Sequence, residues 1–213
     1  MAREHNPDRI ELDHDPLATF EIAKGTPAMT RFDTMQWPML LVGATVIGST
    51  ALACVVPFAA FAAIAARTLT MRSAIITVGA LWLINQALGF TAMGYPWTVN
   101  SLEWGLIIGA AALCATGAAG AVAHHVTRHH VSRWNGFIAL AAALTAAFGV
   151  YEGGLYLGSV ALGGAEIYTA EFIGYVTTLS IAWAAGLQII VLLWGYAVSS
   201  GWVAPGGMAA REP

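Results

Sequence analysis

The sequence contains few charged residues. They make up 10% of its 213 residues, whereas 58% are hydrophobic, and an ordinary soluble domain carries about 25% charged residues. So few charges cannot cover a surface that faces water, which excludes an ordinary soluble domain. No basic patch or arginine-rich stripe indicates nucleic acid as a partner. The composition predicts contact with a lipid bilayer instead.

Several chemical signatures are also missing. The two cysteines lie inside apolar runs, where they are expected to pack rather than to form a disulfide. The sequence has no Ser/His/Asp arrangement, phosphate loop or CxxC motif. No histidine lies inside an expected membrane span, as a bis-histidine haem site would need, and the polar start of the chain does not predict a cleavable signal peptide. The sequence therefore does not favour an enzyme and identifies no cofactor.

The charges that are present gather at the N-terminus, where seven of the twelve acidic residues lie within the first 33 positions. Residues 1–35 are interrupted by prolines and a glycine, and we predict that they form a polar N-terminal tail. We predict a transmembrane helical bundle for residues 36–200 and a polar C-terminal tail for residues 201–213.

Five apolar runs account for the predicted bundle. They cover residues 37–66, 73–94, 102–123, 134–159 and 172–199. Each reaches the length of about 20 residues that a helix needs to cross the hydrocarbon core. Bilayers admit only helices or closed barrels, and the runs lack the alternation of barrel strands. We therefore predict an all-α integral membrane protein with about five transmembrane helices and a kink at Pro57.

Arginines mark one end of this bundle. Arg67, Arg72, Arg128 and Arg133 follow the first and third runs, and no lysine or arginine follows the second and fourth. The positive-inside rule places the arginine-bearing loops in the cytoplasm. The protein is therefore expected to be a multi-pass protein of the cell membrane, and specifically of a bacterial inner membrane.

Helices two and three resemble helices four and five in the order of their polar residues. Asn85-Gln86 and Tyr151-Glu152 each lie late in one helix, and Glu103 and Glu171 each begin the helix that returns. This pattern is typical of a parallel two-helix repeat; the alternative is chance similarity between apolar sequences.

The repeat predicts a polar cavity in one half of the membrane. Gln86 and Glu152 both lie about 12 Å from the end of their helix at 1.5 Å per residue. We expect them to line this cavity with Asn85, Tyr151, Glu103 and Glu171. An intramembrane carboxylate rarely faces lipid, so Glu152 is the strongest candidate for binding an ion.

Each of these residues also has a structural interpretation. Glu103 follows Asn100 at the spacing of a capping box, and Glu171 lies where the helix dipole favours an anion. The structural alternative for Glu152 is snorkelling to the membrane surface. The structural alternative for Gln86, as for Gln188 in the fifth helix, is a hydrogen bond to a neighbouring helix.

Two further patterns are less specific. Glycines four residues apart, at 105 and 109, 149 and 153, and 154 and 158, indicate close helix packing within the chain, a homo-oligomer or partner subunits. His125 and His129 lie four residues apart, share a helix face if the third helix continues, and are the candidate metal ligands. Because no third ligand lies nearby, a polar interfacial loop is the favoured explanation, and metal contact or sensing of cytoplasmic pH is the alternative.

Three functions follow from these patterns. The first is a transporter or channel-like protein for a small solute or cation, with Glu152 as its ion-binding group. The second is a non-catalytic membrane subunit or assembly factor of a larger complex, for example a respiratory one. The third is a membrane-embedded metal-handling protein.

Overall fold

A computed structural model describes residue 43 and residues 57–129 and 135–200. These residues are helical apart from short connections. The helices are α3 (Phe58–Thr68), α4 (Met71–Thr91), α5 (Val99–His129), α6 (Asn135–Leu162) and α7 (Ala170–Ser199), with a 3₁₀ turn, η3 (Ala165–Ile167), before α7. The prediction of an all-α protein is confirmed for the described part of the chain.

Four of these helices, α4 to α7, are long and apolar enough to cross a membrane. Their bounds agree with the second to fifth apolar runs to within a few residues, except that α5 continues through the histidine cluster. Large apolar side chains on all four are more than half exposed, among them Leu83, Leu106, Leu157 and Leu193. Such surfaces suit lipid rather than water. The described residues thus contain four candidate spans of a multi-pass membrane protein.

The predicted first span, residues 37–66, lies mostly outside the described residues, as do both predicted tails. Its described part begins α3 directly after Pro57, and α3 has only 11 residues. That length is well short of the 20 or so that a spanning helix needs. Most of the segment expected to kink also lies outside the described residues.

Threonines begin three of the helices. Thr70, Thr98 and Thr169 each accept a hydrogen bond from the backbone N–H three residues later, which satisfies a donor that the first turn would otherwise leave unpaired. At α5 this differs from the expected capping box at Asn100, because α5 already begins at Val99 and Thr98 provides the cap.

Glycines with positive φ angles end two of the helices. Gly94 follows α4 with a φ of 70°, and Gly163 and Gly164 follow α6 with φ angles of 93° and 103°. Side chains rarely adopt this conformation, so glycine permits the chain to turn back sharply.

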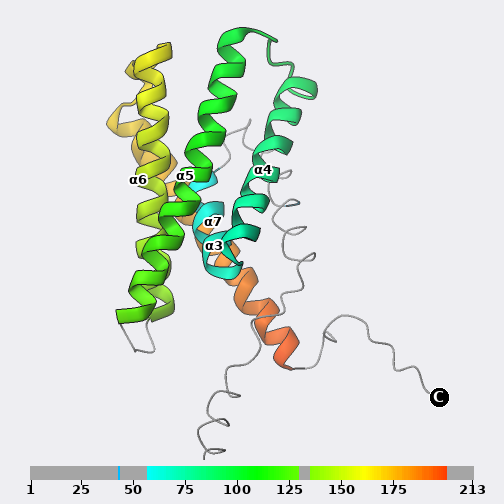
Figure 1. Ribbon diagram of the computed structural model, residues 1–213, viewed down its shortest axis with the longest axis vertical. Coiled ribbons are helices and arrows are strands. Elements are labelled where there is room, and N and C mark those ends of the chain that lie inside the picture. Colours follow the sequence, from blue (N-terminus) through cyan, green and yellow to red (C-terminus); the bar gives the residue numbers. More distant parts are fainter. Residues whose placement is uncertain (1–42, 44–56, 130–134, 201–213) are drawn as a thin grey trace, which may run out of the picture.

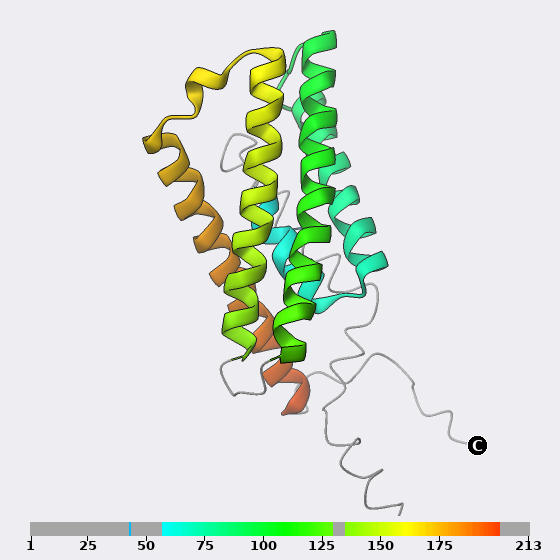
Figure 2. The ribbon, with the colours of Figure 1, turned by 60° about the vertical axis from the view of Figure 1, so that its left-hand side comes forward.

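Successive long helices run in opposite directions (Figures 1 and 2). The α3–α4 connection, the end of α5 and the start of α6 lie at one end of the bundle, so Arg67 and Arg72 share that end with the start of α6. The α4–α5 and α6–α7 connections lie at the other end. The two hairpins thus point the same way, as a repeat would require, but α4 packs along α5 whereas α7 diverges from α6 toward their connection (Figure 2).

Helix α3 lies at the centre of the bundle. It packs against α4, α5, α6 and α7, and all residues from Phe58 to Ala65 are at most 1% exposed. Small residues on α5 and α6, including Ala112, Ala115 and Ala143, complete the core. A helix that is apolar on all sides is suited to this central position.

Candidate functional site

Glu152 lies well inside a candidate membrane span. It precedes the end of α6 by ten residues, about 15 Å along the helix. The side chain is only partly exposed, and its Oε2 atom is buried without a hydrogen-bond partner in the described structure. Leaving a buried polar group unsatisfied costs about 1–3 kcal/mol, and more if the group is charged. The burial of this oxygen is therefore costly to the fold.

Tyr151, the neighbour of Glu152, is 7% exposed and joins α6 to the central helix. Its ring lies 5.9 Å from that of Phe58, the first residue of α3, centroid to centroid. Glu152 therefore lies near the level at which α3 begins, deep between the helices. The predicted pair Tyr151-Glu152 occupies this level together.

An aromatic group from the α6–α7 connection covers the same side of α6. Tyr168 packs edge-on against Tyr156 at 5.4 Å and against Phe172 at 5.5 Å, both between ring centroids. Tyr156 lies one helical turn after Glu152 and so shares its face. Burial, and secondly the negative charge of Glu152, raises the pKa of the Tyr168 hydroxyl to about 12. Tyr168 is thus close enough for its charge state to depend on Glu152.

Sequence reasoning missed both of these tyrosines. The spacing of four residues between Glu152 and Tyr156 is a signal that could have identified Tyr156. Tyr168 gave no comparable signal, because its approach depends on how the α6–α7 connection folds.

The other predicted cavity residues lie in a separate pocket between α4 and α5. This pocket has a volume of about 230 Å³. Its lining combines amides and a hydroxyl with aromatic rings and small or apolar residues: Asn85, Gln86, Gly89, Phe90, Tyr95, Asn100, Ser101, Trp104, Gly105 and Ile108. Asn85 and Gln86 share this lining with residues of the α4–α5 connection and of α5, and not with the carboxylates.

Contacts at glycines of α5 and α6 show how deep Gln86 and Glu152 lie along the bundle. On α5, Gly105 faces Gln86, whose Oε1 atom would lie 2.7 Å from a Cβ added there. On α6, Gly154 faces Ala111 of α5. Gly105 and Ala111 are six residues apart, about 9 Å along the helix, and Glu152 lies beyond Gly154. The structure therefore places Gln86 and Glu152 at different depths.

Glu103 and Glu171 remain near the starts of α5 and α7, where both side chains are exposed. Neither lines the pocket between α4 and α5. Glu171 lies in the first turn of α7, the position that the helix dipole favours for an anion. The structure does not gather the four polar residues in one cavity, and the roles predicted for them stay predictions.

The expected hydrogen bond of Gln188 with another helix is present. Arg67 Nη1 of α3 donates to Gln188 Oε1 of α7 at 3.0 Å. Arg67 was expected in an exposed loop, but its side chain is partly buried at the end of α3. This bond joins two helices whose residues are 121 positions apart in the chain.

The histidine cluster extends α5, so His125 and His129 lie on one helix, four residues apart. The side chain of His125 is exposed, and that of His129 lies outside the described side chains. Within the described part of the chain, no group of three His, Cys, Asp or Glu side chains is arranged to hold a metal ion.

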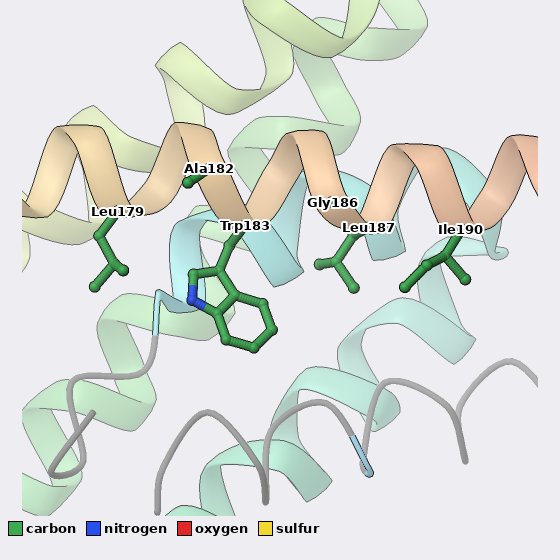
Figure 3. Close-up of a pocket in the computed structure, with 6 residues that line it drawn as sticks. All are labelled: Leu179, Ala182, Trp183, Gly186, Leu187 and Ile190. Carbon is green, nitrogen blue, oxygen red and sulfur yellow. The ribbon is translucent and has the colours of Figure 1, made fainter. Parts of the chain in front are cut away.

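An apolar groove of about 260 Å³ follows α7 (Figure 3). Trp183, Leu179 and Leu187 project from the same side of the helix, and the Trp183 ring lies 5.6 Å from that of Phe61 in α3, centroid to centroid. The lining residues that the structure describes are all apolar. Such a groove is suited to lipid or to another helix.

No protein-family model matches the chain, and the searches found no curated protein and no solved structure with significant similarity to it.

Proposed function

We propose that this protein is a small membrane transporter in which Glu152 binds a proton or a small cation during the transport cycle. The observation that supports this most directly is the buried, unpartnered Oε2 atom of Glu152, inside a helix long enough to span the membrane. Ionisable residues at such positions are costly and commonly mark ion or proton pathways. A purely structural carboxylate would be expected to have a partner.

The surroundings of Glu152 suit a site that is loaded from one side. The side chain is partly exposed, and the α6–α7 connection brings Tyr168 over the same face of α6. This connection lies at the end of the bundle opposite Arg67 and Arg72. If the arginines are cytoplasmic, as the positive-inside rule predicts, Glu152 loads from the outside of the cell.

The proposal includes the finer predictions about the chain. The cell membrane, and specifically a bacterial inner membrane, is the proposed location, and the two hairpins α4–α5 and α6–α7 are proposed to be a repeat. Their shared direction supports the repeat. The divergence of α6 and α7 would then be a specialisation of the hairpin that carries Glu152.

Flux measurements test the proposal. Purified protein in liposomes should move protons or a small cation such as Na⁺ or K⁺ down an imposed gradient, and Glu152→Gln should abolish that flux while the protein still folds. Glu166→Gln is the matched control, because it removes an exposed carboxylate in the α6–α7 connection. Equal flux in the Glu152→Gln and unmodified proteins would contradict the proposal.

Labelling by a carbodiimide gives an independent measurement of the same group. Glu152 should react with a hydrophobic carbodiimide in membranes, and the transported ion should protect it. The Glu152→Gln protein provides the blank. Labelling that no tested cation or pH change affects would show that Glu152 does not exchange a ligand.

A further inference from the structure

We propose that the pocket between α4 and α5 binds a small, uncharged molecule that carries an amide- or urea-like hydrogen-bonding group. This inference deepens the proposed transport function by naming a class of solute, and it rests on that function for the role of the site. Binding itself can be measured without any flux.

The volume of the pocket limits the size of the molecule. Sites for drug-sized ligands generally measure about 300–1,000 Å³, whereas this pocket measures about 230 Å³. The pocket therefore suits a molecule smaller than a typical drug. Its lining includes Tyr95 of the α4–α5 connection and Asn100 and Ser101 from the first turn of α5, so it lies at that end of the two helices.

The lining selects against charge. Gln86 and Asn100 each carry an amide donor and a carbonyl acceptor in this lining. No charged side chain belongs to the described lining, and Glu103, although next to Trp104 in sequence, is exposed outside it. A charged ligand would lose hydration without gaining a counter-charge, which is costly. A neutral molecule with its own donors and acceptors avoids that loss.

Aromatic rings give the pocket defined walls. Trp97 folds back from the connection and stacks on Phe90, with ring centroids 4.5 Å apart. Tyr95 packs so close to Gly89 that an added Cβ would lie 2.9 Å from its Cδ2 atom. Such rings can cover a small planar group while the amides bond its edges.

Two contacts between α4 and α5 hold the polar part of the pocket. Gln86 lies directly against Gly105, where an added Cβ would be 2.7 Å from its Oε1 atom. One turn earlier on α4, the Trp82 indole Nε1 donates to the Gly105 carbonyl oxygen at 2.8 Å. These contacts set the position of Gln86, so a methyl group at Gly105 should displace it.

Two pairs of probes of nearly equal shape test the charge preference. The full chain in phosphatidylcholine nanodiscs is titrated with acetamide and acetate, and with N-methylurea and N-methylguanidinium. Saturation-transfer NMR follows the methyl group of each probe. We expect saturable binding of acetamide and N-methylurea and no saturable binding of their charged counterparts.

Substitutions test whether binding occurs in this pocket. Gln86→Leu should weaken binding of the neutral probes about 3- to 10-fold, the loss expected for one hydrogen bond. Gly105→Ala should weaken it as well, because its Cβ would displace the Gln86 carbonyl. Gly117→Ala is the matched control on α5, since nothing lies within 4 Å of its Cβ position, and it should bind as the unmodified protein does.

Three results would overturn the proposal: no saturable binding of either neutral probe, equal binding of the charged probes, or unmodified affinity in Gln86→Leu. If Gly105→Ala fails to fold, Gln86→Leu still decides the question. Glu152→Gln separates this proposal from the transport proposal. Binding without any Glu152-dependent flux would refute transport alone, and flux without binding would refute the pocket alone.

Discussion

Replacing Gly109 by alanine should destabilise the protein, because the Trp82 ring already occupies the space in question. A Cβ at this position would lie 2.5 Å from Trp82 Cε2, 2.8 Å from Nε1 and 2.9 Å from Cδ2. All three distances are below 3.0 Å, and the three atoms belong to one rigid bicyclic ring. The indole must move as a whole, and this movement should weaken or break its hydrogen bond to the Gly105 carbonyl oxygen.

The magnitude follows from two costs and one gain. Overpacking generally costs about 1–3 kcal/mol, and a lost hydrogen bond adds about 0.5–1.5 kcal/mol. Alanine in a helix gains about 1 kcal/mol over glycine. Gly117→Ala on the same helix shares the gain but meets no atom within 4 Å. The free energy of unfolding of Gly109→Ala should therefore be about 1.5–4.5 kcal/mol lower than that of Gly117→Ala.

Unfolding in mixed micelles by increasing denaturing detergent, followed by circular dichroism, measures this difference. A double-mutant cycle with Trp82→Phe isolates the contact, because the smaller ring should relieve the clash and reduce the cost of Gly109→Ala. Equal stability of Gly109→Ala and Gly117→Ala would refute the reasoning. So would a cost of Gly109→Ala that Trp82→Phe leaves unchanged.

Three more predictions concern single side chains. Gln188→Leu removes the acceptor of the partly buried Arg67 and should lower the free energy of unfolding by about 1–3 kcal/mol in the same detergent titration. Thr98→Ala removes the cap of α5 and should cost about 1 kcal/mol. Glu152→Gln removes a negative charge that opposes ionisation of Tyr168, so the pKa of Tyr168 should fall. Burial should still keep this pKa above that of a free tyrosine. Ultraviolet difference titration against a Tyr168→Phe variant measures it.

These three predictions fail in different ways. Unchanged stability of Gln188→Leu would mean that the Arg67 guanidinium finds another acceptor at no cost. Unchanged stability of Thr98→Ala would mean that water satisfies the first turn of α5 equally well. A pKa of Tyr168 that does not respond to Glu152→Gln would mean that burial alone raises it.

The sequence predicted the long helices because their signals are local. Apolar length and turn residues place the second span at 73–94 and the fourth at 134–159, close to the observed α4 and α6. The start of α5 was harder, since Thr98 and Asn100 are both good caps and only the folded loop shows that Thr98 accepts the bond.

Contacts between distant helices could not be predicted. Gln188 was expected to bond a neighbouring helix, but nothing in the sequence named Arg67 as the donor. The depth of Glu152 was readable from its position in the helix, whereas the separation of Gln86 from it depends on how α4 and α6 pack against α5. Pairing of this kind is decided by side-chain shape across the whole bundle.

The central position of α3 has a consequence for the order in which the bundle is completed during synthesis. Ribosomes make α3 first among the described helices, yet α5, α6 and α7 surround it. When α3 leaves the ribosome, the helices that surround it have not yet been synthesised. The hydrogen bond of Arg67 can form only after Gln188, 121 residues later, has been made. A chain that ends before α7 would leave α3 without its contacts with that helix and the Arg67 guanidinium without this acceptor. Helix α7, the last of the described helices to be made, therefore completes the packing around α3, the first of them.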